Sequence, residues 1–301
     1  MRLALAAAFC VALLTSPALA IAQSKAAATA TASAIGQDPP ADAAHPARME
    51  VIHVPSGGVR INGIVYVAAG AGPHPTFVLF HGLPGNERNL DLAQAVRRAG
   101  WNVVAVNYRG SWGSPGAFSF AQNLEDARAV LAFVRDPANA GPLQIDAHRI
   151  AIGGHSMGGW VTAETLAADA GALGGVTISA GDMGLLGLGG RQNRAGAVQT
   201  MADNRESLNA TAEAMADEVI AHADAWTFAA LAPKLKDRRL YVLYSDDFVK
   251  GHSESLVAGI MAAGGTLVTT AHEPTDHSWS DHRIALETLV IDWLKGLPGA
   301  P

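Results

Sequence analysis

The chain has 301 residues, of which 49% are hydrophobic and 16% are charged, and its formal net charge is −6. These values are typical of a globular protein, and the sequence contains no cluster of lysine and arginine of the kind that binds nucleic acid. Composition therefore argues against a nucleic-acid partner and predicts one sizeable folded core.

The first residues have the pattern of a secretory signal peptide. Arg2 gives a positive start, an apolar run from about Leu3 to Leu14 follows, and Ala18 and Ala20 have the spacing that signal peptidase recognises. An apolar run of about a dozen residues is too short to span a membrane, which takes about 20. We expect residues 1–22 to be a cleaved signal peptide. The mature protein is then periplasmic or secreted, with no stable membrane insertion.

The segment at residues 23–47 is rich in alanine, contains proline and lacks regularly spaced large apolar side chains. This composition is typical of a flexible linker. Cleavage of the leader also removes Cys10, the single cysteine, so packing alone has to stabilise the mature protein. The remaining residues 48–299 are expected to form the folded domain.

From about Met49, short apolar runs alternate with amphipathic stretches, which is typical of a mostly parallel sheet covered by helices. The strand candidates are residues 63–69, 76–80, 101–108, 149–154, 174–180, 239–245 and 265–271. Apolar spacing and end signals predict helices from Asn86 to about Ala99, through residues 124–134, and from about Asp281 to Lys295. The expected fold class is α/β.

Residues 182–236 interrupt this alternation, because they are longer than a simple crossover requires and have an alanine-rich helical pattern. We expect a helical insertion here, forming a lid over the carboxyl edge of the sheet. An elongated crossover helix packed on the side of the sheet is the open alternative.

The stretch "GGHSMGG" at residues 153–159 places a serine between glycines, after an apolar strand candidate and before a helical stretch. This order of strand, sharp turn and helix is typical of a nucleophile elbow, with Gly154 and Gly158 giving the backbone room to turn. Ser156 is therefore the candidate nucleophile. The amide of Met157 at the start of the helix is a candidate donor to an oxyanion.

The sequence "HGLPG" at residues 81–85 follows the strand candidate at 76–80. An oxyanion hole needs a second main-chain N–H from this loop, and the amide of Leu83 is the candidate. For the side chain of His81 we expect a role in fixing the loop or in lining the substrate pocket.

A serine nucleophile needs a base and an orienting acid, which follow it in the chain order Ser, Asp, His in this architecture. His277 lies in a loop before the last predicted helix and is the preferred base. Asp246 and Asp247 both follow the strand candidate at 239–245. Neighbouring side chains that leave a strand point in different directions, so only one of the two is expected to face His277. Asp247 is favoured because it lies three residues past Tyr244, where a short turn would aim it inward, and Asp246 is the alternative.

The motifs HGLPG, NYRGSWGSPG, GHSMGG, SDDF and TDHSWSD, in this order, resemble those of α/β-hydrolase fold serine hydrolases, particularly the branch of dienelactone hydrolases and prolyl-oligopeptidase catalytic domains. The resemblance covers about Val51 to Leu294. It implies an eight-stranded, mostly parallel sheet, with Ser156, Asp247 and His277 as a catalytic triad. It implies nothing about the substrate.

The stretch "NYRGSWGSPGAFSF" follows the strand candidate at 101–108 and is expected at the same sheet edge as the elbow. Arg109, Trp112 and Phe118 are candidates to line a substrate pocket. In the alternative interpretation, Trp112 packs under the loop as plain core and Arg109 pairs with a surface acid.

The leading hypothesis is an enzyme that hydrolyses small-molecule carboxylic esters through an acyl-enzyme, without a cofactor or metal. An amidase or peptidase would use the same residues. Alternatives from other classes are a non-catalytic binding protein and a periplasmic metal-binding protein. The metal hypothesis uses the cluster His272, Asp276, His277, Asp281 and His282. The sequence does not indicate an oligomeric state.

Overall fold

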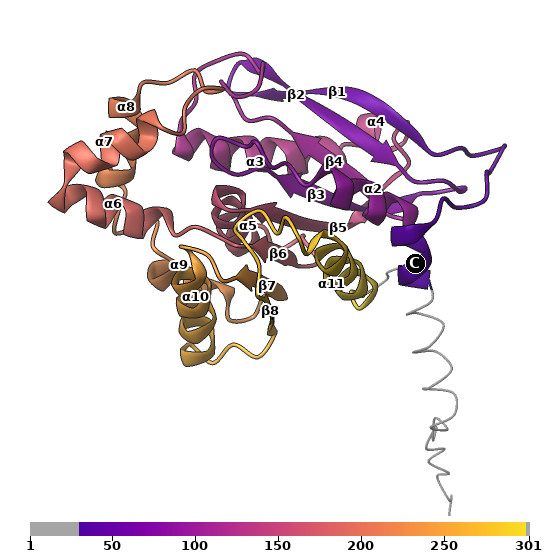
Figure 1. Cartoon of the computed structure of the whole chain (residues 1–301). Helices are drawn as coiled ribbons and strands as arrows, with labels where there is room; N and C mark the ends of the chain where they lie inside the picture. The colour runs from indigo at the N-terminus through magenta and orange to yellow at the C-terminus, as the bar shows by residue number, and fades with distance from the viewer. Residues whose placement is uncertain (1–29, 299–301) are drawn as a thin grey trace, which may run out of the picture.

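A computed structural model describes residues 30–298 and contains an eight-stranded sheet in the order β1-β2-β4-β3-β5-β6-β7-β8 (Figure 1). The strands are β1 (Arg48–Ser56), β2 (Val59–Val67), β3 (His74–Phe80), β4 (Asn102–Val106), β5 (Ile145–His155), β6 (Gly175–Ile178), β7 (Leu240–Ser245) and β8 (Val268–Glu273). All neighbours from β4 to β8 pair in parallel, and β2 pairs antiparallel with both β1 and β4. The expected fold class, a mostly parallel sheet flanked by helices, is confirmed.

The edge strand β1 is absent from the runs that the sequence marked as strands. It alternates between buried side chains, such as Val54, and exposed ones, such as Val51 at 67% exposure. Only one face of this antiparallel edge strand is covered, so β1 lacks the continuous apolar run that marks a strand buried on both faces. The seven other strands overlap the predicted runs.

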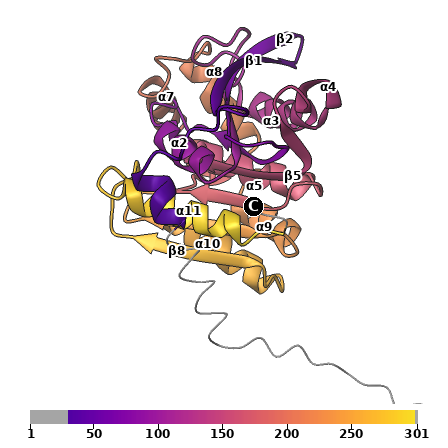
Figure 2. The same ribbon diagram turned by 90° about the vertical axis from the view of Figure 1, so that its right-hand side faces the viewer.

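Helices cover both faces of the sheet (Figures 1 and 2). They are α2 (Leu90–Arg98), α3 (Phe120–Arg135), α4 (Pro137–Ala140), α5 (Met157–Ala168), α6 (Met183–Gln192), α7 (Arg194–Ala202), α8 (Ala212–Ala221), α9 (Phe228–Leu235), α10 (Lys250–Ala262) and α11 (Arg283–Lys295). One core contains buried side chains of α3, α5, α9 and α10, and the second contains those of α2 and α11. None of the helices in the described part of the chain is both long enough and apolar enough to cross a bilayer.

The helix expected to begin after Asn86 begins four residues later, at Leu90. Its N-cap is Asn89, which has a left-handed backbone (φ 54°) and makes no side-chain cap hydrogen bond. Asparagine tolerates this conformation better than most residues do. The two other predicted helices are present as α3 and α11.

The segment 182–236 forms four helices, α6 to α9, between β6 and β7. Figure 1 shows α6, α7 and α8 gathered to one side of the sheet. In contrast, α9 packs against α5 and α10, the position of a crossover helix. Helices α6 to α8 therefore precede α9 as additional elements of the connection from β6 to β7.

The flexible linker predicted over 23–47 is wrong for residues 30–36, which are helical and packed beside α11 (Figures 1 and 2). Thr31 Oγ1 donates a hydrogen bond to Asp292 at 2.5 Å, and Arg98 Nε donates to the carbonyl of Ala34 at 2.5 Å. Ala34 is 6% exposed and belongs to the core under α2 and α11. Small side chains allow this close packing, and composition alone does not distinguish it from a tether. The predicted signal peptide, residues 1–22, lies outside the described residues.

Candidate active site

The turn at Ser156 joins β5 directly to α5. Ser156 has φ 58° and ψ −121°, a strained conformation for a residue with a side chain. Gly154 and Gly158 have no room for a Cβ, because it would overlap the carbonyl of Gly158 in the first case and that of Phe80 in the second. The glycines that the sequence suggested as clearance for the turn are therefore required by direct backbone contact.

The loop after β3 lies against this turn. A Cβ on Gly82 would lie 3.0 Å from the Cβ of Ser156. Leu83 and Met157 both line the cavity that contains Ser156. Neither of their amides donates a hydrogen bond to another described residue. Two free main-chain donors thus lie beside the serine, on either side of the turn.

Asp247 and His277 contact one another. His277 Nδ1 lies 2.7 Å from Asp247 Oδ2, and the carboxylate side chain is 2% exposed. Burial alone would raise the pKa of Asp247, but the hydrogen bond and charge of His277, together with nearby hydroxyls, hold this pKa below its usual value. The neighbouring Asp246 instead lies 2.7 Å from Lys250 Nζ and 2.9 Å from His272 Nε2, at the surface.

A chain of buried donors ends at the Asp247 carboxylate. Trp279 Nε1–H donates to Ser179 Oγ (3.1 Å), the hydroxyls of Ser179 and Ser245 are 2.9 Å apart, and Ser245 Oγ donates to Asp247 Oδ2 (3.0 Å). Trp279, Ser179 and Ser245 are all 0% exposed. The indole can only donate and the carboxylate can only accept, so this network supplies hydroxyl donors to Asp247. Sequence analysis missed these three residues, whose positions in separate segments give no local signal.

His155 connects the elbow to the loop of His277. Its Nε2–H donates to the main-chain carbonyl of His277 at 2.7 Å, and the two rings are 4.7 Å apart. His155 lies within the serine motif, but its role depends on a contact with His277, 122 residues away.

No hydrogen bond among the described residues joins Ser156 to His277 directly. Hydrogen bonds between a nucleophile and its base are often long before substrate binds.

His81 and His155 are both nearly inaccessible, at 3% and 4% exposure. Burial lowers the pKa of each from 6.5 to about 4. His81 Nδ1–H donates to the carbonyl of Gly82 at 2.8 Å, so the neutral ring fixes this loop. Its expected structural role agrees with this geometry.

Because His81 and His155 are buried in their neutral forms, we expect the folded protein to lose stability in acid. Between pH 6.5 and 4 the unfolded histidines bind protons that the folded ones do not, so the free energy of unfolding falls as pH falls. Each histidine contributes about 1.4 kcal/mol per pH unit within this window. Urea unfolding at several pH values should show this slope, and His81→Gln should reduce it. An unchanged slope in the variant would contradict the assignment.

The cavity beside Ser156 has a volume of about 620 Å³, within the range of small-molecule sites. Its walls come from the loop after β3, the elbow, α6, α7 and the start of α10. The lining residues are Leu83, Ser156, Met157, Gly181, Asp182, Met183, Leu185, Leu186, Gly189, Gly190, Asn193, Gly196, Ala197, Thr200, Asn204, Phe248, Val249 and His252. The inserted helices therefore form much of the wall.

The residues proposed from sequence as pocket lining lie elsewhere. His81 lines a separate cavity of about 210 Å³. Trp112 Nε1 donates to the carbonyl of Pro84 at 2.7 Å, with the Arg88 guanidinium 5.0 Å from the ring centroid, so Trp112 supports the loop of Leu83. Phe118 is 4% exposed and packs edge-on against Phe120 in the core.

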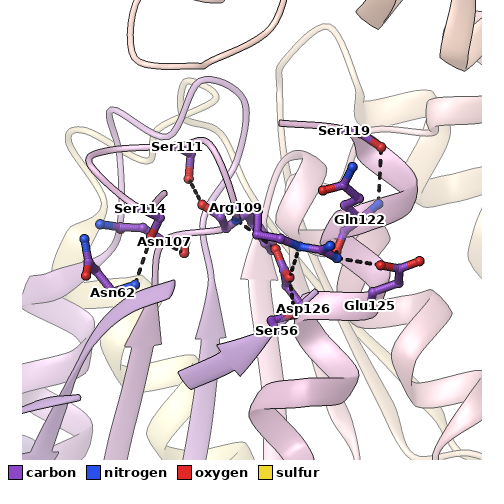
Figure 3. Close-up of polar contacts among 11 residues, drawn as sticks. Ser56, Asn62, Asn107, Arg109, Ser111, Ser114, Ser119, Gln122, Glu125 and Asp126 are labelled. Carbon is purple, nitrogen blue, oxygen red and sulfur yellow. Dashed lines mark hydrogen bonds and ion pairs between the residues drawn. The ribbon is translucent and has the colours of Figure 1, made fainter. Parts of the chain in front are cut away.

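Arg109 belongs to a polar network that also includes Ser56, Glu125 and Asp126 (Figure 3). Its Nε donates to Asp126 Oδ1 (2.7 Å) and its Nη2 to Glu125 Oε2 (2.6 Å). Ser56 Oγ also donates to Asp126 Oδ1 (2.5 Å), which ties β1 to α3. The arginine side chain is 7% exposed and that of Asp126 is 0% exposed. The alternative interpretation, in which Arg109 pairs with a surface acid, fits the contact with the exposed Glu125 but not the contact with the buried Asp126.

Removing this guanidinium should destabilise the protein strongly. Arg109→Met leaves the buried Asp126 charge without its counter-ion, which typically costs about 3–5 kcal/mol. Urea unfolding measures the change. Arg194→Met is the matched control, because Arg194 and Asp217 form an exposed pair with side chains 53% and 54% accessible. This control should leave stability nearly unchanged, and equal effects of the two substitutions would contradict the prediction.

The histidines and acids of the metal hypothesis are paired separately. His272 contacts Asp246, His277 contacts Asp247, and His282 contacts Asp281 at 2.9 Å. Within residues 30–298, no three His, Cys, Asp or Glu side chains converge as a ligand set for one ion. The geometry therefore gives no support to the metal-binding alternative.

The sheet order, the elbow and the position of the acid and histidine agree with the resemblance noted in the sequence. The family model of the alpha/beta hydrolase family matches residues 77–286. The chain belongs to this family. The predicted kinship with α/β-hydrolase fold serine hydrolases is thereby confirmed.

Curated relatives of this hydrolase include uncharacterized proteins of two Mycobacterium tuberculosis strains, CDC 1551 and H37Rv. Each is 30% identical to it over 124 residues, which is 41% of this chain and 42% of the relative. The match thus spans less than half of either protein.

Solved structures show the same fold at low sequence identity. An esterase of Pyrobaculum calidifontis is 16% identical with a TM-score of 0.61, covering 94% of this chain and 93% of its own. The acylaminoacyl peptidase of Pyrococcus horikoshii is 18% identical with a TM-score of 0.62, covering 83% and 41%. Dipeptidyl peptidase 4 of Porphyromonas gingivalis is 17% identical with a TM-score of 0.58, covering 84% and 36%. This hydrolase spans less than half the length of these two peptidases.

Proposed function

We propose that this hydrolase cleaves carboxylic esters through an acyl-enzyme formed on Ser156, with His277 as general base and Asp247 as the orienting acid. The observation that carries the proposal is the 2.7 Å contact between His277 Nδ1 and Asp247 Oδ2 at the sheet edge that presents Ser156. An ionised carboxylate accepts hydrogen bonds only, so Nδ1 carries the proton. The lone pair of Nε2 is then available to take a proton from a serine hydroxyl.

The proposed reaction has two halves. His277 Nε2 removes the proton of Ser156 Oγ as this oxygen attacks the ester carbonyl, and the amides of Leu83 and Met157 donate hydrogen bonds to the oxyanion. The C–O bond then breaks, and His277 returns the proton to the departing alcohol. Water attacks the acyl-enzyme in the same way, which releases the acid and restores Ser156.

The composition of the cavity supports a small-molecule ester. Many of its lining side chains are apolar, including Met183, Leu186 and Phe248, and it lies against the elbow. An apolar wall with few polar groups suits an ester with an organic acyl or alcohol part. The esterase of Pyrobaculum calidifontis shares the fold over nearly its whole length. Amide or peptide hydrolysis with the same residues is the second candidate, favoured by the similarity to acylaminoacyl peptidase.

A labelling experiment tests the proposal. The purified protein should hydrolyse 4-nitrophenyl acyl esters and should react covalently with a fluorophosphonate probe. Peptide mass spectrometry should locate the adduct on Ser156, and the adduct should block hydrolysis. Labelling at another residue, or ester hydrolysis that persists after labelling, would overturn the proposal. Matched anilides of the same acyl groups separate the two candidates, because hydrolysis of the anilide alone would favour the amidase.

A further inference from the structure

His252 on α10 lines the cavity beside Ser156, although it is no part of the proposed triad. It lies close to Asp247 in sequence, at the start of the helix that follows β7. The ring is only partly exposed at the molecular surface. A partly exposed imidazole thus lies in a largely apolar cavity.

The tautomer of this ring is determined by a main-chain contact. The amide N–H of Asp182 donates to His252 Nδ1 at 3.1 Å. A main-chain amide can only donate, so Nδ1 must hold a lone pair, and the proton of the neutral ring lies on Nε2. Burial lowers the pKa of His252, although the charges of Asp182 and Asp247 act in the opposite direction. The neutral ring with Nε2–H is therefore the form present near neutral pH.

This Nε2–H donor has no acceptor among residues 30–298. No hydrogen bond of the described residues uses it. Some described polar atoms, such as Nδ1 of His155, are both buried and without a partner, but His252 Nε2 is not one of them. Since His252 Nε2 has no partner among the described residues either, it must be accessible to solvent or to a ligand. The neighbouring polar groups are occupied: Asp182 accepts from the amides of Leu185 and Phe228.

We propose that His252 Nε2–H donates a hydrogen bond to an acceptor oxygen in the substrate, outside the scissile ester group. The inference rests on the proposed function. It narrows the substrate class to esters whose cavity-bound part carries a second oxygen, such as an ether, keto or further ester oxygen, within an otherwise apolar chain. A site built with such a donor discriminates against the analogue that lacks the acceptor, because the donor is then left without a partner.

The test uses isosteric esters. In the first series, 4-nitrophenyl hexanoate is compared with analogues in which an ether oxygen replaces one methylene of the acyl chain, at a different position in each analogue. In the second series, the same replacement is made in the alcohol part of hexanoate esters. For at least one position, the wild type should prefer the ether ester over the all-methylene ester in kcat/KM. His252→Phe should lower kcat/KM for that ether ester by about tenfold more than it changes kcat/KM for the all-methylene ester.

Two further variants separate this role from structural effects. His252→Asn retains an N–H donor and an oxygen that can accept from Asp182, so it should restore part of the ether preference. His148→Phe is the matched control, because His148 is exposed near the amino end of β5 and is not among the residues that line the cavity. It should leave both substrates unchanged.

The inference is overturned if His252→Phe changes ether and methylene esters by the same factor at every position. If thermal unfolding shows that His252→Phe does not fold, the substrate preference of the wild type tests the inference. A wild type with a higher kcat/KM for the methylene ester at every position contradicts it. Failure of the proposed function has a different signature: neither ester is hydrolysed, or hydrolysis survives loss of the Ser156 hydroxyl.

Discussion

Ser156→Ala should lower kcat for ester hydrolysis by about 10⁵- to 10⁶-fold, the size of effect expected when a serine nucleophile is removed. Alanine retains the turn but has no oxygen to form the acyl-enzyme. The φ of 58° at this position is strained for serine and alanine alike, so the fold should be preserved. Initial rates with 4-nitrophenyl esters, measured together with the thermal unfolding temperature, separate chemistry from stability.

Ser255→Ala is the matched control for this substitution. Ser255 is an exposed serine on α10, and the cavity beside Ser156 does not include it. Its removal should leave kcat within about twofold of wild type. A Ser156→Ala protein that folds and retains ester hydrolysis would mean that another group is the nucleophile, and the proposed mechanism would be wrong.

Asp247→Asn should lower kcat by about 10⁴-fold, with a much smaller change in KM. The carboxylate Oδ2 accepts from His277 Nδ1 at 2.7 Å and from Ser245 at 3.0 Å, while Oδ1 accepts from the amide of Val249 at 2.9 Å. An asparagine amide must satisfy the same donors with one oxygen fewer. It therefore favours the histidine tautomer whose Nε2 carries the proton and cannot accept one.

The neighbouring residue provides a close control for this prediction. Asp246→Asn makes the same chemical change one position earlier, where the carboxylate contacts Lys250 and His272 at the surface. Loss of these exposed contacts should change kcat less than about threefold. Steady-state kinetics of both variants on one ester settle the choice of acid, and a reversal of their effects would assign it to Asp246.

Local sequence carries the information that makes most of this fold predictable. Strands buried on both faces appear as continuous apolar runs, and Ser156 is recognisable because the turn that holds it needs glycines at fixed offsets. The same reasoning fails at β1, where one solvated face breaks the apolar run. It also fails at residues 30–36, where small side chains pack closely without a distinctive pattern.

The residues that line the pocket could not be predicted from local sequence. Arg109 and Trp112 were expected beside the substrate because they follow a strand at the right edge. Their side chains instead satisfy partners that lie far away in sequence, Asp126 for the arginine and the Pro84 carbonyl for the indole. The cavity wall comes largely from α6 and α7, whose approach to the elbow depends on helix packing. No local pattern encodes that approach.

Patterns along the chain were enough to predict the fold class, the serine turn, the histidine base and the pair of candidate aspartates. These follow from short-range constraints: backbone conformation, burial periodicity and the order of elements. Three features emerge only when the chain is folded: which aspartate faces His277, how Trp279, Ser179 and Ser245 surround that carboxylate, and which donors remain open toward the cavity. Those outcomes depend on the directions of side chains brought together from distant segments, and a direction in space has no counterpart in a one-dimensional pattern.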